Sequence, residues 1–536
     1  MSAFDDLTLG MIPTAWKDGK VYSAIPTETN VDVLEPSRIA GTLSSGMTWD
    51  GNTLVSTGVD SGAYLELSRL GHIGFTYELT LTANLNGSAI QIYAEGNTNV
   101  VLQDGTNTYT FQHSGSGVGI IIRLRFANDQ GATLSNISLN QITNGDVHFI
   151  RGTSGTRVYS SGLLQTITDT NAPRLDYTGG GSPSILIEPQ RKNQFLYSNT
   201  SGSTQFNYNG GAGTLGFSST LASPDGSTTN SMELNPDGTS SQFWAGMGGN
   251  RYDVLTDQTV YTASCFVNYD NYRYVQYGGI FGSQAAVFDL QQETVVSTDT
   301  NVISARVEPY YQNWKRIILT FTFNDTVGNG IGYIVLRAMS SSTSHIHSPS
   351  PTLPMHSYGW QIEQASYPSS YIETTGTAVT RSRDDFKRMG YNGFINVDEG
   401  TFYVESRVDE DFDGLGFLRL KDRTGRNLVE IYYQSSNLFV REKINNSFGA
   451  QTQLGATYAN LKGQFFKLAV TYNSDGTRRI YVNGSQFFSG TDGGDFSNIY
   501  GLNQIQYEGG TGCVNLKSVL YFNRNLTDSE LVSLTT

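Results

Sequence analysis

The sequence predicts an all-β protein made of several β-sandwich or jelly-roll domains in series. Short alternating apolar and polar runs recur along the chain between Gly, Asn, Asp and Ser, and helical periodicity is almost absent. The composition has 59 Gly, 31 Tyr and 27 Phe, with only 15% charged residues, against about 25% in typical domains. At roughly 150 residues per domain, a chain of 536 residues has room for about three or four domains, each with its own core.

Individual runs indicate where strands lie. In residues 317–323, alternate side chains fall on one face of an extended chain. That face is apolar throughout, with Ile317, Leu319, Phe321 and Phe323. Residues 64–67, 75–81 and 120–126 follow similar patterns, so each is predicted to be a strand.

The last segment, NLTDSELVSLTT, is the convincing helix. Thr527 can cap it while the Glu530 side chain reaches back, and Leu526 can pack on Leu531. Upstream, the dipeptides at 475–476 (Asp-Gly) and 483–484 (Asn-Gly) predict hairpin turns on either side of a strand.

Two breaks in composition suggest domain boundaries: the run YTGGGSPS at 177–184 and the charged run at 381–385. They divide the chain into a framework at 1–35, an inserted sandwich at 36–143, a framework and joint at 144–192, a second sandwich at 193–385, and a third domain at 386–536.

The charge of the chain excludes some classes of partner. With 48 acidic against 34 basic residues the net charge is −14, so nucleic acid and anionic membranes are not expected partners. The start, MSAFDDLTLG, lacks the basic and apolar regions of an export signal, and no long apolar run predicts membrane insertion. We therefore expect synthesis in a cytoplasm. Cys265 and Cys513 are predicted to be buried thiols rather than a disulfide.

Four separated segments form a recognisable pattern: FIRGTSGTRVYSSGLLQ (149–165), NAPRLDY (171–177), ILIEPQRKNQFLYS (185–198) and GWQIEQASYPSSYIETTGTAVTRSRDDF (359–386). Their order resembles one seen in phage tail-fibre and other virion-appendage proteins. The start MIPTAWKDGKVYSAIP (11–26) also resembles the opening of that family. The chain departs from the pattern by carrying residues 36–143 before the Arg151 motif, and by having Thr153, Gly155 and Glu373 in place of the usual Ser, Ala and Pro.

Two domains carry resemblances of their own. Residues 193–385 are similar to carbohydrate-binding-module sandwiches. Residues 386–536 resemble a laminin-G-like or concanavalin-A-like jelly roll, through EGTFYVESRV (399–408), FFKLAVTYNSDGTRRIYVNG (465–484) and VLYFNRNLTDSELVSL (519–534).

The resemblances imply a virion structural protein, a phage tail fibre or similar appendage that binds host surface glycans during adsorption. They imply attachment through residues 1–35 to other virion proteins, a homotrimeric assembly, and a place on the virion surface after synthesis in the host cytoplasm. The alternatives are a head fibre or capsid decoration protein, and a glycan depolymerase.

The polar stretch between the strand-like runs at 185–187 and 195–197 raises the question of catalysis. Glu188 could form a glycosidase pair with Glu363 or Glu373. Alternatively, Glu188 pairs with Arg191 or Arg174 in a structural joint, because Pro189 turns the chain beside it. We favour the joint, and no nucleophile or phosphate-binding motif appears elsewhere, so no enzymatic activity is predicted.

Sugar binding needs aromatic platforms beside hydrogen-bonding groups, and the tyrosine-rich run at 260–279 is the best candidate. The predicted ligand-binding residues are Trp244, Tyr269, Tyr272, Tyr274 and Tyr277. Half or more of the aromatic residues in this run are expected to pack inside the sandwich instead.

The candidates for a metal site are the histidines of SHIHSPSPTLPMH, namely His345, His347 and His356. The alternative is an exposed Ser/Pro-rich loop with unliganded histidines, which we favour because no carboxylate or Cys flanks the set. Asp492 and Asp495 could supply oxygen ligands to Ca²⁺, although such a loop is usually only a turn. No cofactor is predicted.

Overall fold

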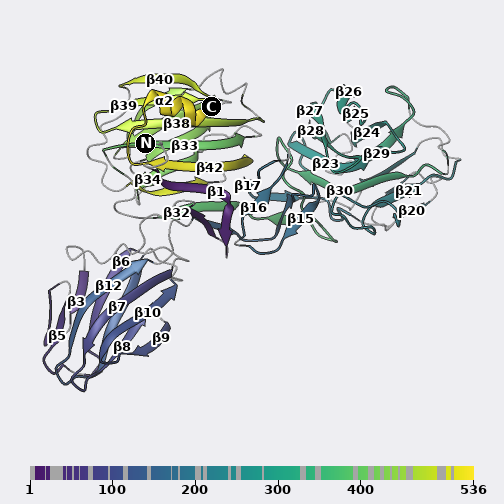
Figure 1. The fold of residues 1–536 in the computed structure, drawn as a ribbon. Helices are drawn as coiled ribbons and strands as arrows, with labels where there is room; N and C mark the ends of the chain where they lie inside the picture. Colours follow the sequence, from purple (N-terminus) through teal and green to yellow (C-terminus); the bar gives the residue numbers. More distant parts are fainter. Residues whose placement is uncertain are drawn as a thin grey trace.

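The computed structural model describes residues 7–17, 20–23, 40–43, 45–50, 53–59, 61–70, 76–94, 97–112, 119–141, 147–170, 172–178, 181–199, 207–208, 214–238, 243–248, 255–279, 283–325, 333–344, 350, 352–389, 396, 398–408, 416–422, 428–434, 437–444, 447–453, 461, 463–491, 502–508 and 512–536. Most of these residues lie in β-strands, and the strands are grouped in separate lobes (Figure 1). The predicted all-β fold class is confirmed.

The first sandwich consists of two five-stranded antiparallel sheets. One has the order β10-β7-β12-β5-β4, with β10 Gly105–Gln112, β7 Thr76–Asn84, β12 Thr133–Gln141, β5 Leu54–Ser56 and β4 Met47–Trp49. The other has the order β3-β6-β11-β8-β9, with β3 Ala40–Leu43, β6 Tyr64–Leu70, β11 Gly119–Asn128, β8 Ala89–Ala94 and β9 Asn97–Val101. Alternate residues such as Leu79 and Leu124 meet in one core between them.

The middle sandwich consists of two six-stranded antiparallel sheets. One has the order β19-β22-β29-β24-β25-β26, with β19 Asn207–Tyr208, β22 Trp244–Gly248, β29 Tyr333–Met339, β24 Tyr274–Gly279, β25 Gln284–Asp289 and β26 Thr294–Thr298. The other has the order β20-β21-β30-β23-β28-β27, with β20 Thr214–Phe217, β21 Met232–Asn235, β30 Met355–Glu363, β23 Val260–Asn268, β28 Trp314–Thr322 and β27 Val302–Pro309. The predicted apolar face of residues 317–323 lies in the core of this sandwich.

Apart from the two-stranded pairs β14–β15 and β18–β31, the remaining strands form a single sheet, which together with its helix we call the body. Its order is β37-β36-β35-β34-β41-β32-β13-β2-β1-β42-β33-β38-β39-β40, and β17 joins it beside β42 with β16 next to β17. The early strands are β1 Leu7–Lys17, β2 Lys20–Ser23, β13 Val147–Arg151, β16 Arg174–Asp176 and β17 Ser184–Ile187. The late elements are β32 Asp384–Met389, β33 Glu399–Val408, β34 Gly416–Asp422, β35 Leu428–Gln434, β36 Asn437–Ile444, β37 Ser447–Gln453, β38 Phe465–Asn473, β39 Thr477–Val482, β40 Ser485–Thr491, β41 Leu502–Glu508, β42 Val514–Phe522 and α2 Asp528–Thr535.

Segments from both ends of the chain share the body. Strand β1 pairs with β42, and purple β1 lies beside yellow β42 in Figure 1. Met11, Ile185 and Val519 are buried in the same core. The sequence placed residues 1–35 and 144–192 in frameworks of their own; the structure differs, because their apolar strands complete the core of the C-terminal domain.

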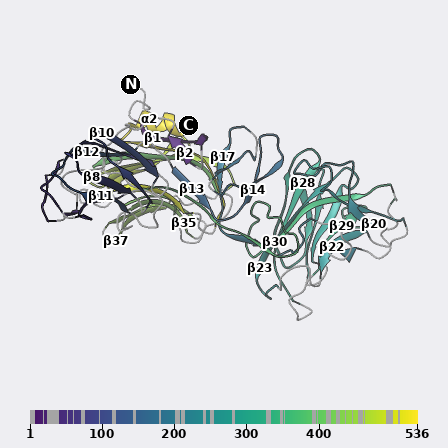
Figure 2. The same ribbon diagram turned by 90° about the horizontal axis from the view of Figure 1, so that it is seen from below.

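Both sandwiches are therefore insertions into the body. The first lies between β2 and β13, which are antiparallel neighbours through Val21 and Val147. The middle sandwich lies between β18 (Arg191–Asn193) and β31 (Val379–Arg381), which pair with each other. A short hairpin of β14 (Gly155–Val158) and β15 (Leu164–Ile167) precedes the second insertion, and Figure 2 shows β14 between the body and the middle sandwich.

Several local predictions are confirmed. The side chain of Thr527 accepts a hydrogen bond from the Glu530 amide, and the Glu530 carboxylate accepts one from the Thr527 amide, at the start of α2. Leu526 and Leu531 are buried in one cluster beneath it. Both cysteines are buried, and neither forms a disulfide. Among the described residues, none of the helices is long and apolar enough to cross a membrane.

Candidate functional site

Glu188 lies in a buried ion cluster where the middle sandwich meets the body. Its Oε2 accepts hydrogen bonds from Arg174 Nη1 at 2.6 Å and from Arg381 Nη1. Ser370 completes the shell, with its amide 2.7 Å from Oε1 and its hydroxyl 2.7 Å from Oε2. Both arginines and the glutamate are at most 1% exposed.

A second carboxylate extends the cluster. Asp384, at the start of β32, accepts hydrogen bonds from Arg174 Nη2 and from the amide of Glu188, the latter at 2.9 Å. Arg151 Nη1 lies 3.4 Å from Asp384 Oδ1. We call the five residues the joint: Arg151, Arg174, Glu188, Arg381 and Asp384. Each of the four sequence motifs between 149 and 386 contributes at least one of them.

The electrostatics of the joint favour the ionised form of Glu188. Burial by itself raises the pKa of this carboxyl, but the guanidinium groups of Arg381 and Arg174 outweigh burial and hold the pKa well below its usual range. A general acid must carry a proton near neutral pH, which Glu188 does not. The geometry is that of a fastening between segments far apart in the chain.

Arg191, the other predicted partner of Glu188, lies at the edge of the joint. Its guanidinium carbon is 4.8 Å from the ring centre of Tyr367, and its Nη2 donates to the Tyr367 hydroxyl at 2.7 Å. Sequence reasoning named Arg174 but missed Arg381 and Asp384. The available signal is the charged run at 381–385, which from its composition alone predicts only a domain boundary.

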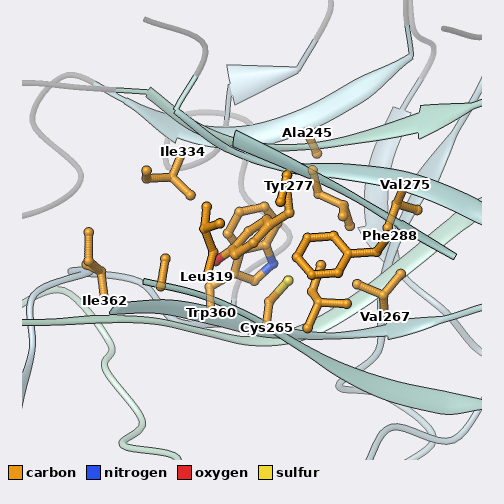
Figure 3. Packing of buried hydrophobic residues seen from close by; sticks show 14 of the residues in the cluster. Ala245, Cys265, Val267, Val275, Tyr277, Phe288, Leu319, Ile334, Trp360 and Ile362 are labelled. Atoms are coloured by element: carbon orange, nitrogen blue, oxygen red, sulfur yellow. The ribbon is translucent and has the colours of Figure 1, made fainter. Parts of the chain in front are cut away.

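Two of the predicted ligand-binding tyrosines are core residues, which corrects that prediction. Tyr277 is 0% exposed and Tyr272 is 5% exposed. Figure 3 shows Tyr277 between the sheets, near Cys265 and Trp360. For Tyr277 the reason is the alternation of β24, which turns Val275 and Tyr277 inward and Gln276 outward, whereas Tyr272 precedes β24 and lies in the same core.

Tyr269 lies elsewhere. It packs partly against the core, and Lys315 Nζ sits 5.3 Å from its ring centre. The Tyr269 amide donates to the carbonyl of Asn313, which precedes β28, so the residue belongs to the β23–β28 end of the sandwich.

Trp244 and Tyr274 remain as candidates, and they share a face. Trp244 pairs in register with Arg337 of β29, and Arg337 pairs with Gln276 of β24. Tyr274 lies two residues before Gln276 and therefore points to the same side. Their inward neighbours, such as Ala245 and Leu336, are in the core. We call Trp244, Arg337, Gln276 and Tyr274 the outer-face cluster.

The outer-face cluster combines aromatic and hydrogen-bonding groups. All four side chains are partly exposed, whereas Val335 and Met339 on the same face are buried. Arg337 Nη1 donates to Gln276 Oε1 at 2.9 Å, which orients both groups. Indole and phenol rings can stack on the apolar face of a sugar, while guanidinium and amide groups bond its hydroxyls. The contribution of Arg337 could not be predicted from the sequence, because it depends on the pairing of β29 with β22 and β24.

Of the predicted metal ligands, His356 alone lies among the described residues. His345, His347, Asp492 and Asp495 lie outside the described residues. His356 is buried, and its Nε2 lies 3.1 Å from Glu233 Oε2. Burial lowers the pKa of His356, although Glu233 opposes the shift. In the part of the chain that the structure describes, no group of three His, Cys, Asp or Glu side chains could hold a metal ion.

Comparisons with known proteins add similarities of fold. No family model and no curated protein matches the sequence. A solved binding domain of botulinum neurotoxin DC, in complex with rat synaptotagmin II, aligns with 28% of this chain and 40% of its own, at 14% identity and a TM-score of 0.25. Domain 4 of an extracellular GH43 arabinanase from Geobacillus stearothermophilus, in complex with arabinotriose, aligns with 31% of this chain and 81% of its own, at 11% identity and a TM-score of 0.24. The chain thus spans less than half the length of the neurotoxin domain.

Proposed function

We propose that this protein is a glycan-binding structural component of a virion, a tail fibre or similar appendage, and that the outer-face cluster contacts the host glycan. The observation that carries the proposal is the placement of Trp244, Arg337 and Gln276 side by side on three neighbouring strands. With Tyr274 beside them, these groups offer both stacking and hydrogen bonding to a sugar.

The appendage role rests on the sequence resemblance and on what its motifs do. The motifs that resemble those of tail-fibre proteins supply the joint, which fastens the middle sandwich to the body. A fibre must hold its ligand-binding module firmly while the virion meets the cell. We propose further that the chain assembles as a trimer, attaches to other virion proteins, and acts without a cofactor or enzymatic activity; multivalent display would then raise weak sugar affinity.

A glycan array tests the proposal. Full-length protein is applied to an array of defined neutral and acidic oligosaccharides, alongside Trp244→Ala and the control Phe217→Ala. Phe217 is 41% exposed and lies on the opposite sheet of the same sandwich. We expect wild type and Phe217→Ala to bind the same glycans and Trp244→Ala to lose them. A protein that binds none of the glycans would contradict the proposed function.

The location on the virion is tested separately. Cryo-electron microscopy of particles should show the chain in a tail or tail-associated fibre. A position on the capsid would favour the decoration-protein alternative and leave the glycan contact to be judged by the array.

A further inference from the structure

A cleft lies between the middle sandwich and the body, beside the joint. Its volume is about 590 Å³, within the range of roughly 300–1,000 Å³ that is typical of ligand pockets. The β14–β17 region, the ends of β27 and β28, the segment 367–371 and body strands β33 and β42 all contribute to its wall. The cleft lies on the other sheet from the outer-face cluster.

Positive charge exceeds negative charge in this wall. Four arginines line it, Arg157, Arg306, Arg316 and Arg407, against three acids, Asp176, Glu188 and Glu308. The acids already have partners. Arg306 Nε lies 2.9 Å from Glu308, Glu188 is held within the joint, and Asp176 accepts the Val158 amide at 2.9 Å.

Two of the arginines donate to neutral oxygens. Arg157 donates to Gln165 Oε1 at 2.8 Å, and Arg316 donates to the Ser369 carbonyl at 2.7 Å and the Ser264 hydroxyl at 3.1 Å. These hydrogen bonds orient the guanidinium groups without pairing either of them directly with a carboxylate. The excess of arginines over acids in the wall suits an anionic group.

Two polar groups of the wall carry a hydrogen-bond donor that none of the described residues accepts. The Tyr310 hydroxyl and Arg316 Nε are buried and have no hydrogen-bond partner among the described residues. Burial, with Asp176 nearby, raises the pKa of Tyr310, so its hydroxyl keeps the proton. Buried donors are rarely left without an acceptor in folded proteins.

An aromatic surface accompanies these donors. The Phe266 ring centre lies 4.9 Å from that of Tyr310 and 5.6 Å from the guanidinium carbon of Arg316. A sugar ring could rest on such a surface while its acidic group faces Tyr310 and Arg316.

We propose that this cleft binds a carboxylate-bearing sugar residue of an acidic glycan. The carboxylate accepts hydrogen bonds from Tyr310, Arg316 and Arg157, and the ring packs on the aromatic wall. The inference rests on the proposed glycan-binding function and adds a second subsite, specific for acidic sugars, between the sandwich and the body.

Calorimetric titration of the full chain tests the subsite. The probes are galacturonic acid oligosaccharides and N-acetylneuraminic acid, with galactose oligosaccharides as the neutral comparison. Tyr310→Phe removes one hydroxyl that has no described partner, so its thermal stability should stay at the wild-type level or rise. We expect this variant to bind the acidic probe about tenfold more weakly, and Arg157→Gln to do likewise, whereas the control Phe217→Ala leaves that binding unchanged.

The possible results separate the two proposals. Absence of binding by both acidic probes, equal affinity for the neutral probe, or unchanged affinity in Tyr310→Phe would each overturn the cleft subsite. If acidic glycans bind and only Trp244→Ala weakens them, the subsite fails and the outer-face function stands. If acidic and neutral probes both fail to bind and the array is also empty, both proposals fail.

Discussion

The two inserted sandwiches are attached to the body in different ways. The first leaves and returns through β2 and β13, which are paired through their backbones at Lys20, Val21, Val147 and His148. The middle sandwich has an equivalent pair, β18 and β31, and adds the joint of buried charges. A domain can thus be inserted through an antiparallel strand pair alone. The joint is an additional set of contacts that holds the middle sandwich against the body.

A buried carboxylate in each region shows the same contrast. Asp129 of the first sandwich accepts hydrogen bonds from the amides of Gly58 and Val59 at 2.9 and 2.7 Å, and from the Ser56 hydroxyl at 2.7 Å. All its partners belong to that sandwich. Glu188 instead takes guanidinium partners 14 and 193 residues away. Neutral donors therefore tie together segments within one sandwich at Asp129, whereas charged donors at Glu188 tie the middle sandwich to the body.

Removing the glutamate of the joint should have the largest effect. Glu188→Ala leaves Arg174 and Arg381 buried without their carboxylate, which should lower the free energy of unfolding by about 3–5 kcal/mol. The control Glu308→Ala breaks an exposed ion pair with Arg306 and should change it by less than about 1 kcal/mol. Chemical denaturation measures both. Equal losses in the two variants would show that the joint is no stronger than a surface pair.

Lowering the pH should lower the stability of both the joint and the first sandwich. Burial raises the pKa of each carboxyl, but its partners outweigh burial, so the folded pKa lies below the ordinary 4.5 of Glu188 and 3.8 of Asp129. Their stabilising contribution is complete above these ordinary values and is lost as the pH falls toward the folded values. Calorimetry between pH 7 and pH 3 should show a transition temperature that decreases once the pH is lowered beyond about 4.5. A transition unchanged down to pH 3 would contradict this account.

Asp129→Asn should act on the first sandwich alone. The amide keeps one acceptor oxygen but brings a donor toward the Gly58 and Val59 amides, which should destabilise that sandwich by about 1–3 kcal/mol. Hydrogen exchange should rise in β5 and β12 and stay unchanged in β23 and β28. Glu66→Gln, at an exposed pair with Arg123, serves as the control. Faster exchange in the middle sandwich would mean that the two insertions are coupled.

Substitution of Arg191 should have the smallest effect on stability. Arg191→Gln removes both the guanidinium from the Tyr367 ring and its hydrogen bond to the Tyr367 hydroxyl, which together should contribute about 1–2 kcal/mol. Thermal unfolding compared with the exposed neighbour change Lys192→Gln measures it. A loss as large as that of Glu188→Ala would place Arg191 inside the joint after all.

Features encoded over short distances could be predicted from the sequence. The cap of α2 depends on Thr527 and Glu530, three residues apart, and the apolar side of residues 317–323 depends on strand alternation alone. The Glu188–Arg174 pair, 14 residues apart, was also within reach.

Features that depend on distant segments could not be predicted in this way. No pattern in residues 7–17 indicates that they pair with residues 514–522, so the nesting of the domains was missed. Tyr274 and Tyr277 look alike in sequence, and only the position of Val275 against the core decides which one faces outward. The outer-face cluster likewise needs β22, β29 and β24 side by side, which only the fold provides.

The most direct test of the central claim is a calorimetric titration with the strongest glycan found on the array. Wild type, Trp244→Ala and Phe217→Ala are compared at one salt concentration. Loss of an aromatic stacking contact should weaken binding by about tenfold in Trp244→Ala, since such contacts contribute about 0.5–1.5 kcal/mol beyond the area they bury, while Phe217→Ala matches wild type. Equal affinity for all three proteins would contradict the claim that the outer-face cluster binds the glycan.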